Sequence, residues 1–233
     1  IIVLIEALVM GTQILLYSAN VSLEEEEEEI TGPMVWGMLA FTFAFALALF
    51  LIVPLLLTQL FDISSPLVSN LVDGVIRIAT FILYLAGINL MPDIKRVWAY
   101  HGAEHKTVNA YEDGVPLEVE HVRKYPTAHT RCGTGFILIV LVLATIIFAF
   151  LGWPDLWLRI LSRVALIPVI AALGYELTRM GAAHAHNKIV HALLVPGLAL
   201  QSMTTREPDD KQMETAILAL NKVIEADELE DES

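Results

Sequence analysis

The sequence is poor in cysteine and in positive charge. Its 233 residues include a single cysteine, Cys132, so no disulfide can form within the chain and nothing indicates an oxidising compartment. Lys and Arg number 14 against 27 Asp and Glu, and the formal net charge is −13. Because nucleic-acid binding needs clustered basic residues, this balance excludes nucleic acid as the main partner. The first stretch has no basic region followed by a cleavage site and does not predict a signal peptide.

Long uncharged runs are what the sequence has in abundance. Hydrophobic residues make up 56% of the chain, and the mean hydropathy is +0.63. Soluble domains are usually less apolar, and runs of about 20 apolar residues are long enough to cross a bilayer as helices. We therefore expect an all-α fold, a polytopic membrane helix bundle with about five spans. The expected spans are 1–19, 34–61, 67–91, 136–152 and 156–177.

The remaining segments suggest how the domains are organised. We expect residues 1–203 to form a membrane domain, with a helical and loop segment, 92–135, inserted between spans three and four. Residues 204–233 should form a C-terminal cytosolic helix with an acidic tail, and the carboxylate run Glu24–Glu29 predicts a solvated loop. An apolar stripe at helical spacing predicts that the C-terminal helix packs on the domain surface or against a partner. The stripe consists of Met213, Ala216, Ile217, Leu220 and Ile224.

Basic residues are unevenly distributed between the two sides that five spans would create. One side holds the loop 20–33, the segment 92–135 and everything after residue 178. Its Lys and Arg excess predicts, by the positive-inside rule, that this side is cytoplasmic. All seven histidines and the cysteine then face the cytoplasm. The basic residues on that side are Lys95, Arg96, Lys106, Arg123, Lys124, Arg131, Arg179, Lys188, Arg206, Lys211 and Lys222.

A metal-binding motif lies just after the third expected span. His101, Glu104 and His105 form the pattern H-x-x-E-H. On a helix, residues four apart share one face, so the two imidazoles can bind one metal ion, and zinc is the default metal for such a pair. Glu104 is then the candidate catalytic base, which would take a proton from metal-bound water. The alternative is a wet interfacial helix with two solvated histidines.

Further ligands are available on both sides of this motif. His129 and Cys132 lie three residues apart, close to the start of the fourth expected span. His101, His105 and Cys132 would leave a fourth position for water, as in catalytic zinc sites, whereas the addition of His129 would close the site, as in structural ones. Glu112 and Glu176 are possible carboxylate ligands in place of these.

Two opposite charges lie inside the third expected span. Asp73 and Arg77 are four residues apart and share one helix face. Charges are costly in hydrocarbon, and the cost falls if the pair faces the bundle interior. The pair predicts either a polar pathway or an ion pair that fixes helix packing. Arg159 and Arg163 are expected to extend to the nearby membrane surface.

Six short motifs occur in order along the chain: Tyr17–Asn20, Pro92-Asp93, His101–Thr107, Arg131–Thr134, Pro196–Leu198 and Thr204–Pro208. Together they resemble the YqhQ-like family of bacterial integral membrane proteins. This resemblance implies a protein of the bacterial inner membrane with a metal-dependent role and no established reaction. It also implies a Gly-rich stretch before the first span, which this sequence lacks, and so a missing N-terminal segment.

Three functions are compatible with these features. The first is a zinc-dependent hydrolase embedded in the membrane, acting on an unknown substrate at the cytosolic surface. The second is a non-catalytic membrane scaffold with a structural zinc site and a C-terminal helix that docks a protein partner. The third, a transporter that uses Asp73 and Arg77, has the thinnest support, because one charged span is little evidence for a pathway. An open metal position beside Glu104 would favour the hydrolase, and four protein ligands would favour the scaffold.

Overall fold

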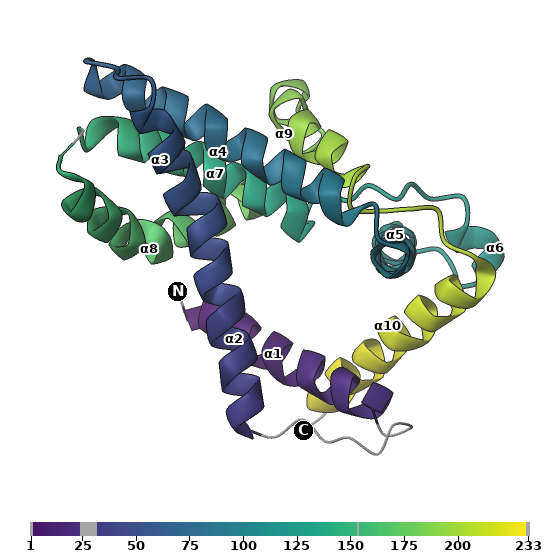
Figure 1. The fold of residues 1–233 in the computed structure, drawn as a ribbon. Helices are drawn as coiled ribbons and strands as arrows, with labels where there is room; N and C mark the ends of the chain where they lie inside the picture. The colour runs from purple at the N-terminus through teal and green to yellow at the C-terminus, as the bar shows by residue number, and fades with distance from the viewer. Residues whose placement is uncertain (1, 24–31, 153, 232–233) are drawn as a thin grey trace. The chain divides into compact units, whose positions relative to one another are not determined.

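The computed structural model describes residues 2–23, 32–152 and 154–231, and these form helices with no strand among them (Figure 1). The run Glu24–Glu29 lies outside the described residues. The elements are α1 (Ile2–Leu23), α2 (Gly32–Leu47), the π-helical turn η2 (Ala48–Ile52), α3 (Val53–Gln59), α4 (Pro66–Ile88), α5 (Pro92–Glu112), α6 (Val119–Val122), α7 (Gly133–Phe150), α8 (Leu156–Ala183), α9 (Lys188–Gln201) and α10 (Asp210–Asp231).

Four helical segments in the described part of the chain are long and apolar enough to cross a membrane. They coincide with four of the five spans expected from the sequence, which confirms the helical membrane bundle. Residues 2–19 of the first expected span, 1–19, lie in helix α1, and the count of five remains a prediction. Helix α9 has 14 residues and is too short to cross a bilayer unaided. The four candidate spans are Met34–Gln59, Pro66–Ile88, Gly133–Phe150 and Leu156–Ala183.

The chain divides into two compact units. Unit 1 consists of residues 1–80 and 142–173, and unit 2 of residues 81–141 and 174–233. The C-terminal segment therefore belongs to the same unit as the segment that carries the two histidines of the motif. The expected domain boundary at residue 203 remains a prediction.

The core of unit 2 joins the C-terminal helix to the segment that follows α4. Ala103 and Ala110 of α5, Val122 of α6 and Met213 of α10 are buried together, and Ala216 and Ile217 pack against them. Helix α10 lies beside both α5 and α6 (Figure 1). The first half of the apolar stripe thus packs on its own unit, because two small alanines on α5 allow the helices to approach closely.

A buried polar network occupies the interior of unit 1. Asp73 forms an ion pair with Arg77 on the next turn of α4, at 2.6 Å, and a second with Arg163 of α8, at 3.0 Å. Arg163 also donates a hydrogen bond to Asn70, at 2.7 Å, and the ring of Phe148 lies within 5.3 Å of both guanidinium carbons. One carboxylate therefore holds two arginines from two candidate spans.

The expectation that Arg163 extends to a membrane surface is wrong. Its side chain is 1% exposed, as is that of Asp73. Arg159 is buried too and donates to the carbonyl oxygen of Pro154. The pairing partner lies 90 residues away in the sequence, so spacing along one helix could not identify it.

Asp73 should be the most sensitive member of this network. Asp73→Asn leaves two buried guanidinium groups without their carboxylate, and loss of one partner of a buried pair costs about 3–5 kcal/mol. We expect a large drop in the thermal unfolding temperature of the detergent-purified protein. The matched control is Asp62→Asn, an exposed aspartate of the same unit, which should change stability by less than about 0.5 kcal/mol. Equal effects of the two substitutions would contradict the network's structural role.

Candidate metal centre

The two histidines of the motif lie one turn apart on helix α5. Their ring centroids are 4.3 Å apart, with the rings inclined at 63°. His105 is buried, whereas His101 is half-buried. The spacing of four residues on a helix therefore brings both imidazoles to one face.

Backbone carbonyls determine which ring nitrogen of each histidine carries the proton. Nδ1 of His101 lies 2.7 Å from the carbonyl oxygen of Thr204, and Nδ1 of His105 lies 2.6 Å from that of Thr127. A carbonyl oxygen only accepts hydrogen bonds, so each Nδ1 donates. In the neutral imidazole, Nε2 then has a free lone pair, which is the arrangement that metal-binding histidines show in proteins.

Cys132 completes a cluster of three potential ligands. Its sulfur lies 3.5 Å from Nε2 of His101, and the ligand atoms of His101, His105 and Cys132 are all within 4.8 Å of one another. Burial raises the pKa of the thiol, but hydrogen bonds with His101, His105 and Thr134 together lower it to about 5. The bond with Cys132 in turn raises the pKa of His101, which burial opposes. Because a thiolate only accepts hydrogen bonds, the lowered thiol pKa goes with a proton on Nε2 of His101. A metal ion that bound both atoms would displace that proton.

Three segments distant in the sequence hold the cluster in place. Helix α5 contacts the segment after α9 at Gly102. Any other residue there would carry a Cβ that overlaps the carbonyl oxygen of Arg206. That close approach lets the Arg206 amide donate to the carbonyl of Trp98, at 2.9 Å, and sets Thr204 against His101. The buried amide of Gln201 accepts from the backbone N–H of His129 and donates to its carbonyl, at 2.9 and 2.8 Å.

His129 and Glu112 bind each other rather than the cluster. Nε2 of His129 lies 3.3 Å from Glu112 Oε1, and its Nδ1 lies 3.4 Å from the backbone nitrogen of Arg131, which donates to it. Glu112 also pairs with the Arg131 side chain. Both nitrogens of His129 are therefore engaged, although its ring centroid is only 5.7 Å from that of His105. Neither residue is in the group of three, and Glu176, another expected carboxylate, is exposed on α8.

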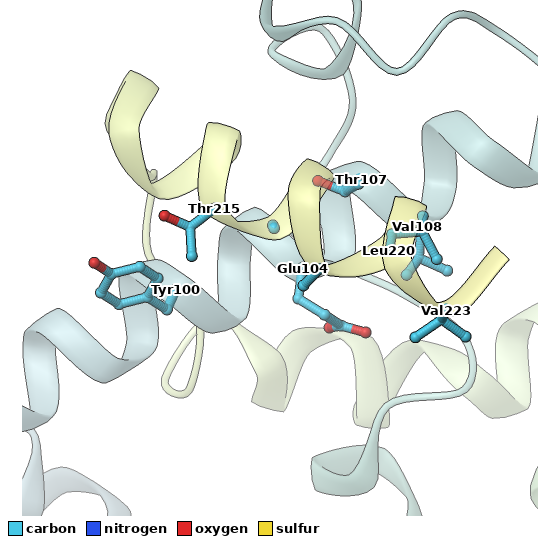
Figure 2. A pocket seen from close by; sticks show the side chains of 9 residues that line it. Tyr100, Glu104, Thr107, Val108, Thr215, Leu220 and Val223 are labelled. Atoms are coloured by element: carbon cyan, nitrogen blue, oxygen red, sulfur yellow. The ribbon is translucent and has the colours of Figure 1, made fainter. Parts of the chain in front are cut away.

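Glu104 extends toward solvent beside the cluster. Its Oε2 lies 3.6 Å from Nε2 of His105, and its side chain is 57% exposed. The same residue lines an open pocket of about 310 Å³ between α5 and α10, where Figure 2 shows it between Tyr100 and Val223. A carboxylate at this position can reach both the cluster and a molecule in the pocket.

The sequence did not identify the groups that orient the ligands. The carbonyls of Thr127 and Thr204 belong to the backbone, and any residue type could supply them. The sequence indicated one of these two regions only indirectly, because the motif Thr204–Pro208 is among those that resemble the family.

Gly102→Ala should destabilise unit 2. The added methyl group would collide with backbone, and overpacking of this kind costs about 1–3 kcal/mol. Gly87→Ala is the matched control, because that helical glycine has open space around it and alanine favours helix. Thermal unfolding of the two variants should therefore move in opposite directions. A shared direction would contradict the close approach at residue 102.

The thiol of Cys132 should ionise at unusually low pH in the metal-free protein. Its folded pKa of about 5 is depressed from the ordinary value of about 8.5, so the thiolate should persist as the pH falls from 8 and disappear only near 5. Ultraviolet thiolate absorbance measures this directly, because the chain has one cysteine and Cys132→Ser provides the baseline. His101→Ala should move the midpoint upward. An ordinary midpoint in the unsubstituted protein would refute the hydrogen-bonded thiolate.

Comparison with known proteins places the chain in a family without assigning a reaction. A family described as "Protein of unknown function (DUF1385)" matches residues 1–226. The chain is also 32% identical over 252 residues to "Uncharacterized protein YqhQ" of Bacillus subtilis (strain 168), with 99% of this chain and 77% of that protein covered. No solved structure matches. The His/Cys cluster thus lies in a helical membrane protein that belongs to the DUF1385, YqhQ-like family.

Proposed function

We propose that the protein is a zinc-dependent hydrolase of the membrane surface, with His101, His105 and Cys132 as ligands and Glu104 as base. The observation that carries this proposal is the convergence of three ligand atoms, with Nδ1 of each histidine bound to a backbone carbonyl so that Nε2 is left for a metal. A mixed set of nitrogen and sulfur ligands suits Zn²⁺. Three protein ligands are typical of catalytic sites, which keep one position for water or substrate.

Glu104 is suited to move a proton at this site. Zn²⁺, when bound, would act as a Lewis acid and lower the pKa of water. The Glu104 carboxylate lies close to the ligand nitrogen of His105 and is open to solvent on its other side. It can therefore accept a proton from the attacking water and return it to the leaving group.

The site should face the cytoplasm of a bacterial inner membrane. The contact of His101 with Thr204 requires the segment before α7 and the segment after α8 to share one side. Four alternating spans satisfy that requirement, and the excess of Lys and Arg on this side favours the cytoplasm. The bilayer is then the immediate partner of the protein, and the substrate approaches from the cytosolic surface.

A scaffold with a structural zinc is the competing function. Its support is that the same three ligands join α5 to the start of α7, so a metal there would also stabilise the fold. The exposed apolar residues Leu218, Val223 and Leu229 on α10 would then dock a protein partner. The engagement of both nitrogens of His129 argues against it, because a closed site would need a fourth protein ligand.

Metal content and activity should respond differently to two substitutions. His105→Ala should abolish retention of one zinc per chain, whereas Glu104→Gln should keep the zinc and lower hydrolysis of a chromogenic ester by about 10²–10⁴-fold, because a base is not a ligand. Controls are His121→Ala, a histidine outside the cluster, and Glu214→Gln, an exposed glutamate on α10. Elemental analysis after gentle purification reads out the metal. Release of zinc by Glu104→Gln would make Glu104 a ligand, and absence of zinc from the native protein would refute the site.

A further inference from the structure

We propose that the pocket between α5 and α10 binds the acyl chain of a membrane lipid ester, which is the substrate of the neighbouring site. This inference rests on the proposed hydrolase and names its substrate class. The pocket measures about 310 Å³, at the lower end of the range of small-molecule sites, and is partly open to solvent. Figure 2 shows the side chains that line it. Its walls include Tyr100, Glu104, Val108, Ala219, Leu220 and Val223.

The walls of the pocket are suited to an apolar occupant. The hydroxyl of Thr107 donates to the carbonyl of Ala103, and that of Thr215 to the carbonyl of Lys211, each at 2.8 Å. Neither threonine therefore offers the pocket an uncommitted hydrogen-bond donor. Most of the other lining residues are aliphatic, and Glu104 is the one charged side chain among them. Such a surface gains free energy chiefly by the burial of hydrocarbon.

The backbone around the pocket disfavours an extended peptide. Enzymes and modules that bind extended peptides commonly hydrogen-bond the peptide main chain along the edge of a strand. Both walls here are α-helices, whose N–H and C=O groups are paired within each helix. An acyl chain needs no such partners, so the pocket favours a lipid over a peptide.

The position of α5 supplies a route from the bilayer. Only residues 89–91 separate α5 from the candidate span α4, so α5 begins close to the end of that span. The first pocket residue, Tyr100, follows about 12 Å further along α5. Tyr100 and Val223 on its walls are 37% and 56% exposed, which leaves room for a chain to enter. A lipid can therefore insert its acyl chain without leaving the interface completely.

Glu104 connects this pocket to the reaction. Its carboxylate borders the pocket and lies beside the ligand nitrogen of His105. In ester hydrolysis, water adds to the acyl carbonyl carbon as Glu104 accepts one of its protons. The bond between that carbon and the alcohol oxygen then breaks, and the proton passes to the departing alcohol. The products are a fatty acid and a lysolipid or alcohol, with no oxidant or reductant required.

Photocrosslinking tests the pocket without relying on catalysis. The zinc-loaded full chain in phosphatidylcholine nanodiscs is irradiated with a diazirine-labelled fatty acid, and the labelled peptides are mapped by mass spectrometry. We expect labelling of Val108, Leu220 and their neighbours, which excess oleic acid should suppress. Ala219→Trp fills the pocket and should lower this labelling about tenfold or more. Leu218→Trp, the matched control, adds the same ring at an exposed α10 residue outside the pocket and should leave the labelling unchanged.

A second measurement separates this inference from the hydrolase itself. Release of fatty acid from a phosphatidylcholine substrate should depend on Glu104, whereas labelling should survive Glu104→Gln. Competed labelling without hydrolysis of any ester or peptide would support the acyl pocket and refute the hydrolase. Hydrolysis of peptides with no competed labelling would refute the acyl pocket and leave the hydrolase standing. Equal labelling of the Ala219→Trp and Leu218→Trp variants would also overturn the inference, because the probe would then be binding elsewhere.

Discussion

Two backbone carbonyls, those of Thr127 and Thr204, are the constraint on which the candidate site depends. Each holds an Nδ1 proton of a histidine and so turns the opposite nitrogen toward Cys132. Without them, two histidines one turn apart on a helix would remain free to rotate and to change tautomer. The rest of unit 2 can be understood as the frame that keeps those two carbonyls in position.

That frame is assembled from segments that lie far apart in the sequence. Because residue 102 is glycine, no side chain keeps α5 away from the backbone segment after α9. Gln201 binds that region to the loop before α7 through two hydrogen bonds with His129. Helix α10 then covers the other side of α5, through Met213 and its neighbours. The same packing that completes the core of unit 2 also creates the apolar pocket beside Glu104, so the fold and the suggested substrate site share one cause.

The sequence was a good guide wherever a property depends on residues close together in the chain. Hydropathy alone predicted four of the candidate spans, and helical spacing predicted that His101 and His105 share a face and that Asp73 and Arg77 pair. Predictions from the sequence were wrong where two interacting residues lie far apart in the chain. Arg163, assigned to a membrane surface, instead meets Asp73 in the interior.

The choice of the third metal ligand could not be predicted from the sequence for the same reason. Cys132 and His129 are three residues apart, and the sequence treated them as equal candidates. The structure brings Cys132 to the histidine pair and turns His129 toward Glu112, because Gln201 holds the backbone of residue 129 from α9. No pattern within the loop contains that information, which comes from a residue 72 positions later.

X-ray absorption at the zinc edge of the zinc-loaded protein tests the central claim most directly, because it counts ligand atoms by type. The account predicts one sulfur at about 2.3 Å, two imidazole nitrogens at about 2.0–2.1 Å and one oxygen from water. A third imidazole in place of that oxygen would make the site closed and structural. A zinc ion without a sulfur neighbour would contradict the account altogether, since Cys132 is the only cysteine in the chain.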